Sequence, residues 1–181
     1  MIKKIILGVL AVLVLGIVAI AAAVSMQPDQ YTVVRSATFD APPEKLFEQV
    51  NDFRNWKQWS PWEKLDPNMK TTLSGPESGK GAGYAWIGND EVGEGKMTIV
   101  ESRPSEMVGI DLEFIQPFAM RSRSDLTFKP EGDKTNVTWA MTGENGIVGK
   151  AFSLVMDMDA MIGKDFEKGF AQMRPIVETA R

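Results

Sequence analysis

The order of predicted elements limits the fold of this 181-residue chain more than any other feature. A strand pattern at residues 31–39 leads to a helix that begins at Pro42 or Pro43, where the fixed φ of proline suits the first helical position. A second short helix at 51–62 precedes a long run of strand-like segments, and one amphipathic helix that begins near Ile147 closes the chain. The sequence therefore predicts a strand-rich domain with helices at both ends.

The clearest strand pairing is a hairpin between residues 107–115 and 118–128, which turns at Gln116–Pro117. In this register two pairs of opposite charges share one face: Glu113 with Arg121, and Asp111 with Arg123. Apolar residues alternate with them on the other face, as expected for a half-buried antiparallel sheet. We interpret the charged residues as surface ion pairs and not as an active-site cluster.

The final helix carries an apolar stripe at helical spacing. Its apolar members are Phe152, Val155, Met156, Ile162, Phe166, Phe170, Met173 and Val177. Asp159 falls near the centre of this stripe, where a lone carboxylate is costly to bury unless it is paired or protonated. Three roles stay open for it: a structural pair with an Arg, Lys or Trp N–H, orientation of a polar ligand group, or acid/base catalysis.

Two absences exclude whole classes of chemistry. The chain has no histidine, which excludes a Ser-His-Asp triad and His-ligated zinc. It has no cysteine, which excludes thiol nucleophiles, Fe–S clusters and disulfides. The net charge of −4 and the lack of a basic run also disfavour nucleic-acid binding. We therefore expect no metal, no cofactor and no nucleic-acid partner.

Residues 5–24 form an apolar segment of twenty residues without a charge. As a helix this segment is long enough to span a hydrocarbon core of ~30 Å. Lys3 and Lys4 precede it, so the positive-inside rule keeps the N-terminus in the cytoplasm. We expect a single-pass anchor in the inner membrane at residues 1–26, a linker at 27–30 and an extracytoplasmic domain at 31–181. The alternative is a signal peptide that is cleaved near Ala23, which releases a soluble exported domain.

Aromatic residues and glycines mark a second region of interest. Trp56, Trp59 and Trp62 lie close together in the sequence, and three indoles are too many to hide in one small helix interface. A hairpin that turns at Asn89–Asp90 would place the small residues Gly93 and Gly95 opposite two aromatic rings, those of Trp86 and Tyr84 respectively. The missing side chains leave space either for the rings or for a ligand.

Several local motifs resemble those of the START-like superfamily that includes polyketide cyclases and dehydrases, also called SRPBCC. These motifs are Asp40-Ala-Pro-Pro-Glu-Lys-Leu-Phe47, Asn51-Asp-Phe53, Trp56, Trp59-Ser-Pro-Trp62-Glu63, and Asp165-Phe-Glu-Lys-Gly169 on the last helix. The resemblance implies an α+β helix-grip fold, in which a curved antiparallel sheet wraps around a long C-terminal helix. It also implies two short helices near the N-terminus and an enclosed apolar cavity.

The resemblance implies a pocket for a hydrophobic small molecule or lipid, and together with the apolar segment at 5–24 it leads us to expect a membrane-anchored protein that binds, senses or transports such a ligand. The residues expected to bind that ligand are Trp59, Trp62, Tyr84, Trp86, Leu112, Phe114, Met120, Trp139, Met156, Asp159 and Phe166. One alternative is an enzyme of the cyclase or dehydrase kind with Asp159 as its acid/base, although the enzyme reading is the less favoured one. A second alternative is a co-chaperone-like interaction module of the envelope.

Overall fold

The computed structural model of the protein describes residues 2–178, which form two compact units. The first unit contains the residues up to Tyr31 together with Asn145–Asp157, and holds helices α1 (Ile2–Ser25) and α4 (Ile147–Ser153). The second unit contains Thr32–Glu144 and the residues from Met158 onward. It holds the sheet and three further helices: α2 (Pro43–Asn51), α3 (Phe53–Trp59) and α5 (Met158–Val177).

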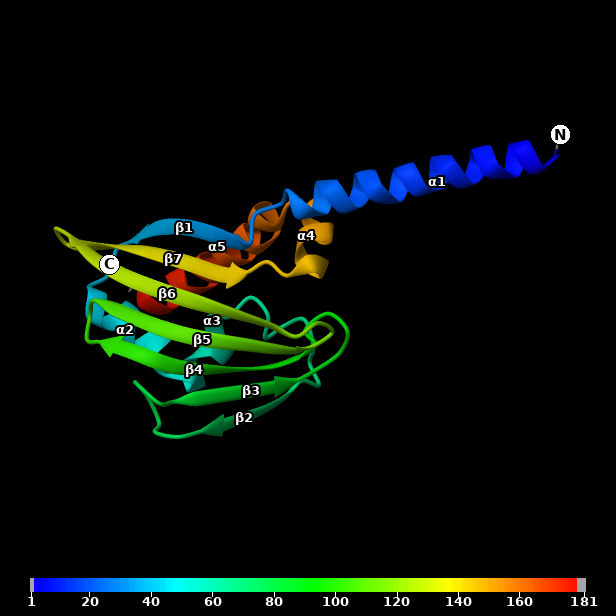
Figure 1. Ribbon diagram of the computed structural model, residues 1–181. Coiled ribbons are helices and arrows are strands. Elements are labelled where there is room, and N and C mark those ends of the chain that lie inside the picture. The colour runs from blue at the N-terminus through cyan, green and yellow to red at the C-terminus, as the bar shows by residue number, and fades with distance from the viewer. Residues whose placement is uncertain (1, 179–181) are drawn as a thin grey trace. The chain divides into compact units, whose positions relative to one another are not determined.

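The sheet has seven strands in the order β1-β7-β6-β5-β4-β3-β2 (Figure 1). Its strands are β1 (Gln30–Phe39), β2 (Lys70–Ser74), β3 (Gly83–Ile87), β4 (Glu94–Arg103), β5 (Met107–Gln116), β6 (Met120–Glu131) and β7 (Lys134–Glu144). Strands β2 to β7 pair antiparallel with their neighbours in the sequence, while β1 lies beside β7. The sheet curves, and helices α2, α3 and α5 lie on its inner side (Figure 1). This arrangement confirms the predicted α+β helix-grip fold.

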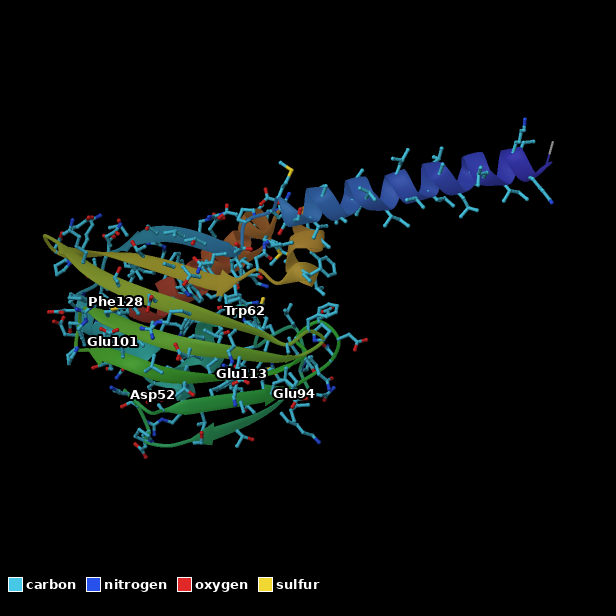
Figure 2. The ribbon with its side chains drawn as sticks, in the orientation of Figure 1. Asp52, Trp62, Glu94, Glu101, Glu113 and Phe128 are labelled. Atoms are coloured by element: carbon cyan, nitrogen blue, oxygen red, sulfur yellow. The ribbon has the colours of Figure 1, made fainter. Side chains whose placement is uncertain are left out.

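The predicted register of the β5–β6 hairpin is confirmed. Glu113 pairs with Arg121 and Asp111 with Arg123 across the two strands. Both pairs lie on the outer face as ion pairs, with N–O distances of 3.6 Å and 3.2 Å. Glu101 also bonds Arg123 on this face, at 3.3 Å, and Glu101 and Glu113 are labelled in Figure 2. The outer face is therefore a solvated ionic surface, as the alternation of charge predicted.

The inner face and the helices form the apolar core. On α5 the buried large side chains recur at helical spacing, at Phe166, Phe170, Met173 and Val177. Helix α2 begins after Pro42, and the Asp52 carboxylate caps α3 by accepting a hydrogen bond of 2.9 Å from the backbone N–H of Arg54. These short helices present the tryptophans of α3 to the inner face of the sheet.

The prediction of one continuous final helix from Ile147 is wrong, because the structure has α4 and α5 as separate helices. The Ser153 hydroxyl donates a hydrogen bond of 2.9 Å to the Gly149 carbonyl, a back-bond that bends and weakens helices. The next turn tightens further, since the Leu154 N–H bonds the Ala151 carbonyl three residues back. The apolar periodicity runs through this break, so the pattern alone did not reveal it.

Candidate ligand site on the inner face

A continuous row of aromatic rings crosses the inner face. The successive ring centroids are Trp86–Tyr84 6.3 Å, Tyr84–Phe53 5.8 Å, Phe53–Trp56 5.3 Å, Trp56–Trp59 4.8 Å, Trp59–Trp139 5.7 Å and Trp139–Phe166 4.0 Å apart. These rings come from β3, α3, β7 and α5. The row therefore brings most of the predicted ligand-binding aromatic residues into one assembly.

One end of this row, formed by Trp59, Trp139 and Phe166 and called here the closed end, is fully packed. The rings of Trp139 and Phe166 stack with an interplanar angle of 4°, and the Trp139 indole N–H donates to the Ser124 hydroxyl at 2.7 Å. Relative exposure is 0% for Trp59, 1% for Trp139 and 0% for Phe166. Protein atoms already cover these three rings.

The other end, called here the open end, consists of Tyr84, Trp86, Leu112, Phe114 and Met120. Phe114 and Met120 are only half-buried, and they pair directly across β5 and β6. The Phe114 ring meets that of Trp86 edge-on at 5.9 Å. Tyr84, Trp86 and Leu112 keep 7%, 8% and 9% of their surface exposed. The same apolar face is thus less completely covered here than at the closed end.

Trp62 lies between the two ends. Its half-buried ring meets Trp139 edge-on at 5.9 Å, and the adjacent Glu63 accepts a hydrogen bond from the Tyr84 hydroxyl (Trp62 is labelled in Figure 2). Leu73 on β2 pairs with Tyr84 and is 51% exposed. Leu73 was not predicted from the sequence to lie at this site, although it is the only apolar residue in its strand.

The predicted register of the β3–β4 hairpin is wrong by two residues. Trp86 pairs with Gly95 and Tyr84 with Met97, because the turn runs from Gly88 to Gly93, where the Gly88 N–H bonds the Gly93 carbonyl at 2.9 Å. A Cβ at Gly95 would overlap the Trp86 ring. The glycine therefore provides room for the ring, one of the two readings that the sequence left open.

The Tyr84 hydroxyl is the main polar group at the open end. It donates a hydrogen bond to the Glu63 carboxylate. Burial raises the pKa of Tyr84 well above its ordinary value, and the bond to Glu63 raises it further. Tyr84 is therefore a neutral phenol near neutral pH, and its partner Glu63 was not foreseen from the sequence.

Asp159 does not lie in the buried interior that the apolar stripe suggested. It sits in the first turn of α5 with 56% of its side chain exposed, and both its oxygens accept hydrogen bonds from the Arg35 guanidinium, at 2.9 and 3.0 Å. This pair lowers the pKa of Asp159. A side chain at Gly163 would overlap Arg35, so the glycine makes room for the Arg35–Asp159 ion pair, called here the Arg35–Asp159 clamp. The inward alternation of Val33, Arg35 and Phe39 in β1 was the signal that could have identified this partner.

Met156 is another residue that the sequence predicted to bind ligand. It belongs to the unit that contains α1, precedes α5 in the sequence, and is 49% exposed. Its expected place on the final helix followed from treating α4 and α5 as one helix. Among residues 2–178, no group of three or more Asp or Glu side chains is arranged to hold a metal ion.

Other proteins with solved structures share this fold. Similar solved structures include a protein from Chromobacterium violaceum (12% identity, TM-score 0.60, 85% of this chain and 100% of the other) and major latex-like protein 151 from Panax ginseng (12%, 0.60, 84% and 100%). The Aha1 dimer from Colwellia psychrerythraea is also similar (13%, 0.58, 82% and 96%). At these identities the likeness establishes the fold alone.

No curated protein is significantly similar to this chain in sequence. The family model described as "Polyketide cyclase / dehydrase and lipid transport" matches residues 30–178, which cover the whole sheet, α2, α3, α4 and α5. The chain therefore belongs to this polyketide cyclase/dehydrase (SRPBCC) family.

Proposed function

We propose that this protein binds a hydrophobic small molecule or lipid in an apolar cavity of the second unit, at the open end of the inner face. The observation that carries the proposal is the incomplete burial of Phe114 and Met120 on a face whose other side chains are mostly apolar. Apolar ligand surface that covers these side chains gains about 25 cal/mol per Å² removed from water. The lipid-transport part of the family description supports the same ligand class.

The Tyr84–Glu63 pair supplies the orientation of the ligand in this proposal. Ligand pockets are mostly apolar with a few well-placed polar groups. The neutral Tyr84 phenol already donates its one proton to Glu63, so a ligand hydroxyl that approaches this pair finds two acceptors, the phenol oxygen and the Glu63 carboxylate. The residues proposed to contact the ligand are Trp62, Tyr84, Trp86, Leu112, Phe114 and Met120. The buried rings that support this site through packing are those of Trp59, Trp139 and Phe166.

We further infer that α1 anchors the protein in a membrane. An 18-residue stretch within Lys3–Ser25 has a mean hydropathy of 3.1, which makes this the one helix among the described residues that is apolar and long enough to cross a bilayer. A signal sequence has the same properties, so the retained anchor is our proposal. Lys3 and Lys4 favour a cytoplasmic N-terminus and an extracytoplasmic domain.

The proposed division of the chain is an anchor at residues 1–26, a linker at 27–30 and a ligand-binding domain at 31–181. The ends of this division, Met1 and residues 179–181, lie outside the described residues.

Binding is favoured over catalysis by the position of Asp159. Arg35 holds this carboxylate ionised and its pKa low, so it is a poor proton donor and a weak base near neutral pH. It is also largely exposed, whereas a tuned catalytic acid is usually desolvated. These observations weigh against the acid/base role that the sequence left open.

The test is native mass spectrometry of the full chain, purified in mild detergent from its own membrane and followed by lipid extraction. The wild type should carry one apolar adduct per chain. Leu112→Trp should lose it, because the larger ring fills the open end. Ile115→Trp is the matched control, since Ile115 lies on the same strand and is exposed.

Two outcomes count against the proposal. A wild type without an adduct contradicts it, as does an adduct that survives Leu112→Trp unchanged, which would place the molecule elsewhere, for example along α1. Loss of the adduct in both variants points to general damage to the sheet. Circular dichroism of each variant separates that damage from a specific effect.

A further inference from the structure

The α4 segment, residues 147–156, exposes a dense set of apolar side chains. Ile147 and Val155 are 80% and 81% exposed, and four further apolar residues are between 40% and 50% exposed: Val148, Phe152, Leu154 and Met156. Leaving so much apolar surface in water is unfavourable, and a contiguous patch of this kind marks an interaction site. Something of apolar character is therefore expected to cover this segment.

The segment is held at the end of the apolar helix. The Asn145 N–H donates to the Asp29 carbonyl at 2.7 Å, and the Asn145 side-chain amide donates to the Pro28 carbonyl at 3.2 Å. The Lys150 ammonium also forms an ion pair with the Asp29 carboxylate. Asp29 comes only four residues after Ser25, the last residue of α1, so these bonds hold α4 within about 14 Å of the end of α1.

Direct contact confirms this placement within the first unit. Helix α4 contacts α1, and it lies beside the Ser25 end of α1 in Figure 1. Residues 3–22 of α1 are exposed, whereas Ala23 and Val24 in its last turn are half-buried. If α1 spans a bilayer, the apolar residues of α4 are held at the level where the chain leaves the hydrocarbon.

The segment carries almost no net charge, which suits insertion of its apolar side chains into a bilayer interface. Lys150 is the only charged residue between Ile147 and Met156, and Asp29 neutralises it. Insertion of this segment therefore brings no unpaired charge to the interface, and anionic headgroups are not required. Because α1 already holds the segment at the membrane, even a modest apolar area suffices for docking.

We propose that residues 147–156 dock into the interfacial region of the bilayer beside α1, as a second, monotopic membrane contact. This inference rests on the proposed membrane anchor. Docking would bury Ile147 and Val155 among lipid headgroups and acyl chains.

The absence of native cysteine allows a site-specific test on the full chain. Val155→Cys, Thr72→Cys and Leu10→Cys each receive an environment-sensitive fluorophore, and each protein is reconstituted in phosphatidylcholine nanodiscs. Thr72 is the matched control, because it is exposed on β2 in the second unit. Leu10 reports the middle of α1. Spin-labelled phosphatidylcholine then quenches the fluorophores that lie in lipid.

Docking predicts that the label at position 155 is blue-shifted and quenched several-fold more than the label at position 72. The added substitution Ile147→Glu should reduce that quenching, because a carboxylate resists insertion. Quenching at position 10 but not at 155 would overturn docking while the anchor stands. No quenching at position 10 would instead overturn the anchor itself. A label at 155 that is blue-shifted in native membranes yet not quenched by lipid would assign the surface to a protein partner.

Discussion

The two ends of the inner face differ in how completely the same kind of side chain is covered. At the closed end, rings from α3, β7 and α5 cover one another, as in the parallel stack of Trp139 on Phe166. At the open end, Phe114 meets the edge of Trp86 from a neighbouring strand and stays half-buried. The difference indicates that the closed end stabilises the fold and that the open end retains apolar surface for a ligand.

The largest expected effect distinguishes these two roles through stability. Trp139→Ala should lower the free energy of unfolding by about 3–5 kcal/mol, because it removes a buried ring and leaves a cavity. Trp62→Ala should cost clearly less, since that ring is already half-exposed. Urea unfolding followed by circular dichroism measures both. Equal losses for the two variants would remove the distinction between a packed and an open end.

A smaller loss of stability is expected at Gly95, which lies against the Trp86 ring of the open end. Gly95→Ala should destabilise the protein by about 1–3 kcal/mol, because the new methyl group overlaps the Trp86 ring and forces it to move. The same displacement should alter the tryptophan emission and weaken binding of the apolar ligand. Gly132→Ala is the control for a substitution at an uncrowded glycine, although its positive φ adds local strain. Unchanged emission in Gly95→Ala would contradict the close ring contact.

The polar group at the open end should have a smaller effect on stability and a distinct pH dependence. Tyr84→Phe should cost about 1–2 kcal/mol, through loss of the bond to Glu63. The raised pKa of Tyr84 means that the folded state keeps the phenol proton while the unfolded chain releases it above about pH 10. This contribution is therefore present below that pH and is lost as the pH rises further.

Absorbance at 295 nm, which reports phenolate, measures this directly. The wild type should show one tyrosine that ionises late, and Tyr84→Phe should lack it. Ionisation of that tyrosine near pH 10 in the folded protein would contradict the buried, hydrogen-bonded phenol.

The smallest effect is expected away from both ends, at the Arg35–Asp159 clamp. Because Arg35 lowers the pKa of Asp159, this pair stabilises the fold above the ordinary Asp pKa of about 3.9 and is lost as the pH falls through the lower native value. Thermal unfolding between pH 7 and about pH 3 should therefore depend slightly less on pH in Asp159→Asn than in the wild type. If Asp159→Asn lowered the stability at pH 7 more than Tyr84→Phe does, the Arg35–Asp159 pair would contribute more to stability than expected for an exposed ion pair.

The sequence predicted the fold well wherever a strict alternation was present. The alternation of charged and apolar residues assigned the two faces of β5 and β6, and the turn at Gln116–Pro117 then gave the register to the residue, including Glu113 opposite Arg121. The β3–β4 register failed by two residues because the glycines at 88 and 93 allow a longer turn than Asn89–Asp90 suggested. Local alternation determines which face a residue occupies, but turn geometry determines its partner.

The candidate site could be predicted only in part. Trp139 and Phe166 were correctly assigned to the interior, but the pattern did not distinguish a packed ring from a partly open one, because that depends on contacts between distant elements. The partners of Asp159 and Tyr84 were missed for the same reason. Arg35 and Asp159 are 124 residues apart, and Glu63 and Tyr84 are 21 residues apart in the chain.

The most direct test of the central claim is photo-crosslinking of the full chain with a diazirine-labelled lipid, followed by peptide mass spectrometry. The open-end account predicts adducts on peptides that contain Trp62, Phe114 or Met120, and none on Trp139 or Phe166. Adducts confined to α1 and the α4 segment, with the open end unlabelled, would contradict it.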